Sequence, residues 1–178
     1  MPKVRVLAFE PLAANYFLLN RNIEENKLSG AVSAYCLALT DRNLASNLHV
    51  KDTGFGSALS SFADPIDYRG ETFVAQFEQG MIGLTLDSFI ERFDPPFPTH
   101  LKIDVDGIED RIIAGAPATL ADPRLKSILI ELDSSRPKYT NDIIAEIERH
   151  GFRLESRRHS QMVEESTFAD LYNYIFRR

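Results

Sequence analysis

The most informative segment of the chain is Leu101-Lys102-Ile103-Asp104-Val105-Asp106-Gly107-Ile108-Glu109. Its first five positions are largely apolar and β-branched, which predicts a short strand followed by a helix from about Ile108. Asp104 falls at the carboxyl end of this strand. Ligands of open α/β sheets bind beyond the carboxyl ends of the strands, so Asp104 is the first candidate for a residue that takes part in chemistry.

The two acidic residues that follow have a simpler interpretation. If Asp106 is the N-cap of the helix, Glu109 is its third residue, and the spacing matches a capping-box arrangement. We therefore interpret Asp106 and Glu109 first as structural. The alternative for Asp104 is an acid that only accepts hydrogen bonds from nearby backbone amides.

Strand and helix patterns alternate along the rest of the chain. Apolar runs predict strands over 4–9, 32–39, 127–132, 152–156 and 171–176, and helical periodicity predicts helices over 12–27, from Thr85, from about 108 with a break at Pro117, and from Thr140 to Gly151. This alternation predicts an α/β fold with a mostly parallel sheet and helices on both faces. The last two strands are joined without a helix, so we expect them to be antiparallel.

Residues 42–84 are less regular than the rest. Asn47–Val50 and Thr72–Phe77 are weak strand candidates in an antiparallel excursion. Function often resides on such segments, so we expect the excursion to cap an acceptor site, with Ser57, Ser60 and Ser61 as contact candidates. No repeat or linker divides the chain, and residues 1–178 suit a single domain.

Composition argues against several classes of protein. The formal net charge of -6 disfavours general binding to nucleic acid or to anionic membranes. Cys36 is the one cysteine and the four histidines are scattered, so neither a disulfide nor a zinc site is predicted. No apolar run approaches the ~20 residues of a membrane helix, and the first residues lack the core of a signal peptide. We therefore expect a cytoplasmic location.

Two further acids follow or interrupt apolar runs. Glu10 ends the first predicted strand, where an acid in dinucleotide-binding folds accepts hydrogen bonds from ribose hydroxyls. Its alternative role is a solvated acid at the start of a helix. Glu131 interrupts the apolar run 127–132. It is expected either to line the active cleft or to reach solvent at a sheet edge, since an acid in such a strand needs a partner or water.

Several short blocks occur in an order typical of one known family. They are Ala8-Phe9-Glu10-Pro11, Ala38-Leu39, Gly83-Leu84-Thr85-Leu86-Asp87, Lys102-Ile103-Asp104-Val105-Asp106-Gly107 with Glu109 and Gly115-Ala116, and Leu129-Ile130-Glu131. Together they resemble the FkbM methyltransferases over about residues 4–132, with Asp106 where the family usually has Glu. The resemblance implies a Rossmann-like class I methyltransferase fold and S-adenosylmethionine as cofactor.

The resemblance also implies roles for individual residues. Glu10, with Pro11 beside it, contacts the ribose of the cofactor, Ala38-Leu39 lies beside the adenine, and Asp104 lies near the methyl-bearing sulfur. Such proteins methylate hydroxyl groups of sugars or natural products, so the expected partner is a small-molecule or carbohydrate acceptor. A hydroxyl acceptor needs a base, for which Asp104 is the first candidate and Glu131 the second.

One departure from the family pattern affects the expected activity. The family's first strand and its glycine-rich turn belong before Lys3, and they are missing from the sequence. Either the coding region starts upstream of Met1 or the protein is truncated, and in both cases we expect the 178 residues to bind the donor weakly or not at all. An unpaired strand edge near Lys3 is expected to recruit a second chain.

Two alternative functions remain open at this point. The segment 103–107 also resembles the nucleophile strand of haloacid dehalogenase-type phosphohydrolases, with Asp104 as nucleophile and Asp106 as acid/base around magnesium. That motif normally opens its domain, and no later motif with a lysine and paired aspartates is evident. The second alternative is a non-catalytic, partner-binding domain that keeps the fold without donor affinity.

Overall fold

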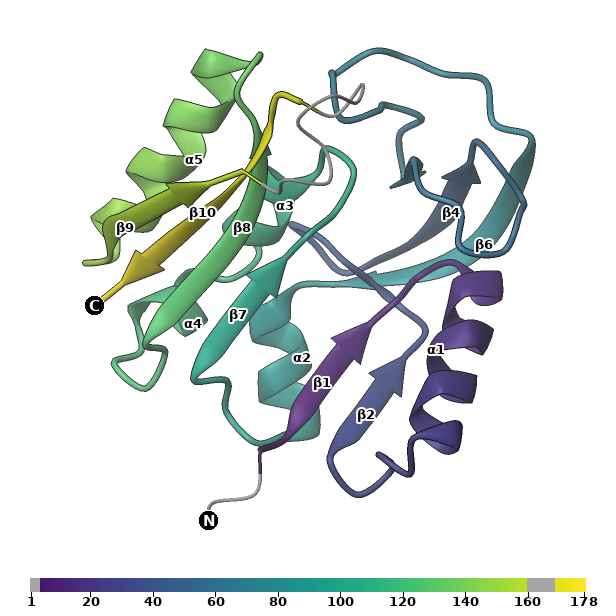
Figure 1. Cartoon of the computed structure of the whole chain (residues 1–178), viewed down its shortest axis with the longest axis horizontal. Helices are drawn as coiled ribbons and strands as arrows, with labels where there is room; N and C mark the ends of the chain where they lie inside the picture. Colours follow the sequence, from purple (N-terminus) through teal and green to yellow (C-terminus); the bar gives the residue numbers. More distant parts are fainter. Residues whose placement is uncertain (1–3, 160–168) are drawn as a thin grey trace.

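A computed structural model describes residues 4–159 and 169–178 of the chain. Its elements are β1 (Val6–Phe9), α1 (Ala13–Glu25), β2 (Val32–Tyr35), β3 (Ala38–Leu39), β4 (Leu44–Val50), β5 (Ser60–Phe62), β6 (Phe77–Leu84), α2 (Leu86–Phe93), β7 (His100–Ile103), α3 (Glu109–Ala114), α4 (Pro117–Ala121), β8 (Ser127–Asp133), α5 (Pro137–Arg149), β9 (Arg153–Arg158) and β10 (Leu171–Arg177) (Figure 1). None of the helices in these ranges is long and apolar enough to cross a membrane.

Within the described residues the strands form three sheets, in the orders β1-β2, β3-β6-β4-β5 and β7-β8-β10-β9. The pairs β1–β2, β3–β6 and β7–β8 are parallel. The pairs β4–β5, β4–β6, β8–β10 and β9–β10 are antiparallel. The α/β class is therefore as predicted, but the expected mostly parallel sheet is wrong. Hairpin-like returns replace helical crossovers in the excursion and at the end of the chain, and such returns produce antiparallel pairs.

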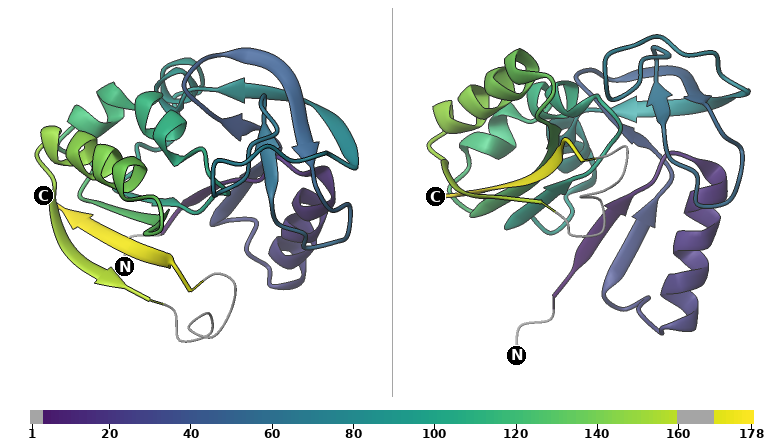
Figure 2. Two further views of the ribbon diagram at one scale, coloured as in Figure 1. Left: turned by 90° about the horizontal axis from the view of Figure 1, so that it is seen from above. Right: turned by 45° about the horizontal axis from the view of Figure 1, so that its top comes forward.

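The larger core lies between the sheet β7-β8-β10-β9 and the helices α3, α4 and α5, which gather on one side of that sheet (Figure 2). In β8, Ile128, Ile130 and Leu132 are buried, whereas the alternate position Glu131 is half-buried. Successive side chains of a strand point to opposite faces, so the helices cover one face of β8 and Glu131 belongs to the other. Because of this alternation, the Glu131 side chain lies outside the core and can contribute to a site.

The excursion over residues 42–84 builds a sheet of its own. Its core consists of Leu12, Ala38, Leu48, Val50, Phe62 and Met81. The strand predicted at Asn47–Val50 lies within β4, but the one predicted at Thr72–Phe77 is wrong, because β6 begins at Phe77. The strand predicted over 32–39 is split: β2 pairs with β1, whereas β3 pairs with β6 of the excursion.

Local signals located the helices more accurately. The Thr85 hydroxyl accepts a hydrogen bond from the Ser88 amide at 3.0 Å, so the predicted N-cap of α2 is confirmed. Pro117 separates α3 from α4 as expected. The last helix begins at Pro137 and not at Thr140, whose buried hydroxyl donates to the Asp133 carbonyl oxygen at 2.8 Å. The final strands β9 and β10 are antiparallel, as predicted.

Helix α2 packs against elements of two sheets. The Phe89 ring lies 5.0 Å from that of Phe9 in β1 and 5.2 Å from that of Tyr35 in β2. Leu86 of the same helix belongs to the larger core together with Ile103 of β7. Figure 1 shows that β1 and β7 run in the same direction. Within the described residues neither is paired with the other, so each keeps one free edge.

Candidate functional site

The parallel pairing of β7 with β8 brings two predicted acids together. Ile103, the last residue of β7, is in register with Ile130, so the residues that follow these two, Asp104 and Glu131, lie close together at this end of the sheet. Burial raises the pKa of Glu131, and the nearby Asp104 carboxylate raises it further. Lys102 Nζ lies 2.6 Å from Asp104 Oδ2, so this carboxylate already has a cationic partner.

Asp106 does not cap the helix that follows it. The N-cap of α3 is Ile108, which makes no side-chain capping hydrogen bond, so the predicted capping-box arrangement is wrong. Instead, Asp106 Oδ2 accepts a hydrogen bond from the Leu59 amide at 2.6 Å. The pKa of Asp106 is raised mainly by burial and also by Asp104, while the amides of Leu59 and Ser60 oppose the shift. Asp106 thus ties the excursion to the end of β7.

Glu10 lies within electrostatic reach of this group. Its Oε1 accepts a hydrogen bond from the Leu12 amide at 2.8 Å, at the start of α1. Its pKa is raised by burial and by the charge of Asp106, against the effect of the Leu12 amide. Glu10 therefore faces the same end of the molecule as Asp106, Asp104 and Glu131. Like charges so arranged attract cations and repel anions.

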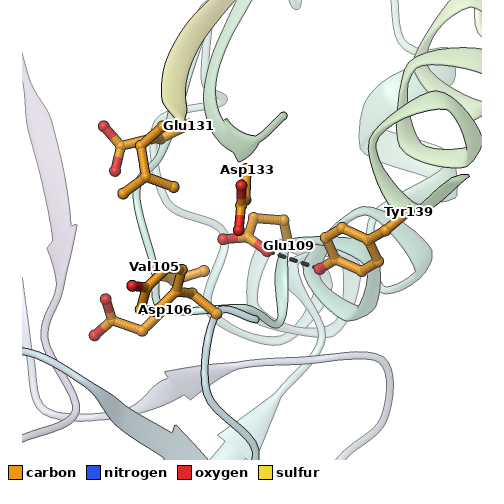
Figure 3. Close-up of a pocket in the computed structure, with 8 residues that line it drawn as sticks. Val105, Asp106, Glu109, Glu131, Asp133 and Tyr139 are labelled. Atoms are coloured by element: carbon orange, nitrogen blue, oxygen red, sulfur yellow. Dashed lines mark hydrogen bonds between the residues drawn. The ribbon is translucent and has the colours of Figure 1, made fainter. Parts of the chain in front are cut away.

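A small pocket of about 20 Å³ adjoins Asp106 and Glu131 (Figure 3). It is lined by Tyr68, Val105, Asp106, Glu109, Glu131, Asp133, Tyr139 and Leu171. Sequence reasoning missed Asp133 and Tyr139. Extending the predicted strand 127–132 by one residue would have placed Asp133 at a strand end, but no local signal marks Tyr139, which arrives from α5.

The residues expected beside the adenine take part in packing. Ala38 is 3% exposed and belongs to the core of the excursion, and Leu39 packs against the larger core. The Pro11 carbonyl oxygen accepts a hydrogen bond from Gln79 Nε2 at 2.8 Å, which joins the end of β1 to β6. These contacts show how the three residues support the fold, and their contact with a cofactor remains a prediction.

Contacts from α1 and α3 hold the excursion over the carboxyl ends of β1 and β7. Asn15 of α1 donates from Nδ2 to the Ser57 carbonyl oxygen at 2.9 Å and accepts from the Gly56 amide at 2.9 Å. Arg111 of α3 forms a salt bridge with Asp64 at 2.7 Å. The hydroxyl groups of Ser57, Ser60 and Ser61 are buried and have no hydrogen-bond partner among the described residues. Buried hydroxyls normally have partners, so these three are available to a ligand or to water.

Within residues 4–159 and 169–178, no group of three or more His, Cys, Asp or Glu side chains has the geometry to hold a metal ion. Cys36 is exposed near Glu10, with its Sγ 3.7 Å from the Pro11 carbonyl oxygen. Burial and the charge of Glu10 raise the pKa of its thiol.

Comparisons with known proteins add family information to this geometry. The profile of the family described as Methyltransferase FkbM domain matches residues 1–154. The chain is also similar to a solved structure, a methyltransferase FkbM from Methylobacillus flagellatus KT, with a TM-score of 0.56 and 14% identity. That likeness covers 98% of this chain and 36% of the other, so this chain spans about a third of the other protein's length. At this identity the likeness concerns the fold alone, and no curated protein matches the chain.

Proposed function

Because this chain belongs to the FkbM methyltransferase domain family, we propose that it transfers the methyl group of S-adenosylmethionine to a hydroxyl group of a sugar or natural product. The observation that carries this proposal is the grouping of Glu10, Asp106, Asp104 and Glu131 at one end of the molecule. These acids come from three separate segments, which only the fold unites. The phosphohydrolase alternative has no support from the comparisons.

The residues fit the chemistry of the donor. S-adenosylmethionine supplies an electrophilic methyl group on a cationic sulfonium, and nearby carboxylates favour such a cation electrostatically. Glu10 directly follows β1, a position that supports its assignment as the acceptor of hydrogen bonds from ribose hydroxyls. The unpartnered hydroxyl of Ser60 lies beside the backbone amide that contacts Asp106, so it offers a further hydrogen bond to a polar ligand.

The proton of the acceptor hydroxyl needs a base near the reacting oxygen. Burial raises the pKa of Glu131, which makes it a stronger base, whereas Asp104 is held by Lys102. We therefore assign proton removal to Glu131 and orientation to Asp104, which reverses the order inferred from the sequence. Proton transfer to a positioned base contributes ~10²–10⁴-fold to the rate.

The acceptor is proposed to enter under the excursion. The buried hydroxyls of Ser57, Ser60 and Ser61 have no partner in the part of the chain that the structure describes, and sugar hydroxyls are suited to satisfy them. The surrounding carboxylates disfavour an anionic acceptor and are compatible with a neutral one. This arrangement supports an uncharged polyhydroxylated acceptor over a phosphorylated one.

Donor binding is the first test. Within the described residues β1 and β7 each keep a free edge beside the proposed donor site, so we expect weak binding and use millimolar S-adenosylhomocysteine in a thermal-shift assay. A ligand at ten times its Kd stabilises the native state by about 1.4 kcal/mol. Glu10→Gln should reduce the shift, whereas Glu24→Gln, an exposed position on α1, should not. The absence of any shift would favour the non-catalytic alternative.

Turnover is the second test. Glu131→Gln should lower kcat at least 100-fold with little change in donor affinity, because proton transfer is lost while the binding surface is kept. Asp104→Asn should also lower kcat more than it lowers donor affinity. Methyl incorporation from labelled donor into a panel of sugars measures both. Unchanged turnover in Glu131→Gln would remove this residue from the mechanism.

A further inference from the structure

The Tyr139 hydroxyl lies at a junction of three segments. It donates a hydrogen bond to Glu109 Oε2 at 2.7 Å, and Asp110 Oδ1 and the Gly107 carbonyl oxygen lie within 3.2 Å of it. Figure 3 shows the Tyr139 and Glu109 side chains pointing toward each other at the edge of the cavity. Glu109 is only 4% exposed, so water does not replace this contact. Tyr139 thereby joins α5 to the start of α3.

Gly107 is held from two sides. Its amide donates to Glu109 Oε1 at 3.2 Å. Its φ of 110° suits glycine, and a Cβ there would lie 2.8 Å from the Asp67 carbonyl oxygen and from Tyr68 Cα. The turn after β7 is thus in contact with Glu109 on one side and with the excursion on the other.

Arg136 completes the connection to the excursion. Its guanidinium stacks on the Tyr139 ring at 3.9 Å from the centroid and donates to the Tyr68 carbonyl oxygen at 2.7 Å. A cation over an aromatic face and a charge-assisted hydrogen bond both restrict motion. The start of α5, the turn and the excursion therefore meet around the buried carboxyl group of Glu109.

We propose that Glu109 and Tyr139 are positioning residues, which hold the Asp104–Gly107 turn under the excursion. Because the Glu109 carboxyl is buried, a negative charge there favours opening of the turn to water over the closed arrangement. Neither side chain needs to touch the substrate. They act through the turn that carries Asp104 and Asp106, so the relevance of the proposal to catalysis rests on the proposed methyl transfer. A pH-dependent change of this turn would move Asp104 and Asp106 relative to Glu10 and Glu131.

The charge balance around Glu109 explains the expected pH dependence. Burial raises its pKa to about 7, and Asp110 adds to the shift, while hydrogen bonds from Tyr139 and from the amides of Gly107 and Glu109 oppose it. The other titratable or charged groups that face it or its partner Tyr139 come from the excursion, the turn, β8 and α5: Tyr68, Asp106, Glu131, Asp133 and Arg136. Local opening that admits water to Glu109 should become about 80-fold more frequent between pH 4.5 and 7, and up to about 300-fold more frequent over the whole titration.

Amide hydrogen exchange of the full chain tests the positioning directly. Over pH 5 to 8.5, corrected for intrinsic rates, protection of residues 104–107 and 67–71 should fall as pH rises and level off above pH 7. Glu109→Gln keeps a carbonyl oxygen for Tyr139 and should remove this dependence. Tyr139→Phe should lower protection of both segments at least tenfold at every pH, while Ile130 in the core of β8 keeps its protection.

The matched control is Lys138→Ala, the neighbouring position on α5, whose exposed side chain pairs with Asp142. Lys138→Ala should leave the hydrogen-exchange protection of residues 104–107 and 67–71 unchanged. Protection within twofold of the wild type in Tyr139→Phe, or an equal loss in β8, would overturn the proposal.

A second experiment tests whether the contact between Glu109 and Tyr139 affects activity. In Tyr139→Phe, kcat should fall tenfold or more with a smaller change in KM, and in Glu109→Gln the wild-type change of kcat near pH 7 should disappear. Altered exchange with unaltered turnover would refute the catalytic part. If the wild-type chain transfers no methyl group, the proposed function fails, whereas hydrogen exchange still decides whether Glu109 and Tyr139 hold the turn.

Discussion

Replacing Glu109 by Gln should change how stability depends on pH. Glu109 is 4% exposed, and its pKa is raised from 4.5 to about 7, chiefly by burial. The folded protein therefore binds this proton more tightly than the unfolded chain does. Stability from this group is fully present below pH 4.5, is lost as pH rises to about 7, and stays constant above. At about 1.36 kcal/mol per pKa unit, the loss amounts to about 3 kcal/mol.

Glu109→Gln cannot ionise, so its stability relative to the wild type should increase by about 3 kcal/mol between pH 4.5 and 8. Urea denaturation followed by circular dichroism, at pH 4.5, 6, 7 and 8, measures this difference. Glu148→Gln, at an exposed position of α5, is the control and should show no such trend. A Glu109→Gln difference that is the same at pH 4.5 and pH 8 would refute the reasoning, since Glu109 would then titrate alike in the folded and unfolded chain.

Three further predictions follow from contacts elsewhere. Glu10→Gln should lower the pKa of Cys36 by removing a nearby charge, so iodoacetamide should alkylate this single thiol faster near pH 8; an unchanged rate would show that the two groups do not interact. Asp87→Ala should cost about 1–2 kcal/mol in urea denaturation, because the carboxylate accepts from two backbone amides at the start of α4, at 2.7 and 2.8 Å. Gly115→Ala should lower the free energy of unfolding by about 3 kcal/mol or more, because its Cβ would overlap a backbone carbonyl oxygen after β3. Gly30→Ala, with nothing near its Cβ, is the control and should have little effect, so equal stabilities of the two variants would contradict the packing described.

Part of the site could be predicted from the sequence because strand ends are marked locally. Apolar runs locate β1, β7 and β8, and the acid at or after the end of a run is easily recognised, which identified Glu10, Asp104 and Glu131 as candidates. Asp106 was identified as well, but its assigned task was wrong. The capping-box spacing describes only residues that are neighbours in sequence. The hydrogen-bond partner of Asp106, the Leu59 amide, lies 47 positions earlier in the chain.

The pairing of strands was less predictable. The run over residues 32–39 contains no marker of the point where the chain leaves β2 for the sheet of the excursion, because that departure depends on β6, which supplies the partner for β3. The excursion had few local signals of its own. Its strands are stabilised by cross-strand contacts and by a core that Leu12 and Ala38 share with it, and such contacts are not visible in a local pattern.

The sequence by itself determined the α/β class, the places where helices begin at Thr85 and break at Pro117, and the acids that end strands. These features depend on caps, prolines and periodicity, which act over a few residues. Only the tertiary structure decided that the sheets are mixed, that the acids share one rim, and that Tyr139 meets Glu109 across 30 positions of chain. Burial and long-range pairing set these outcomes, because the environment of a buried carboxyl is supplied by segments that are distant in sequence.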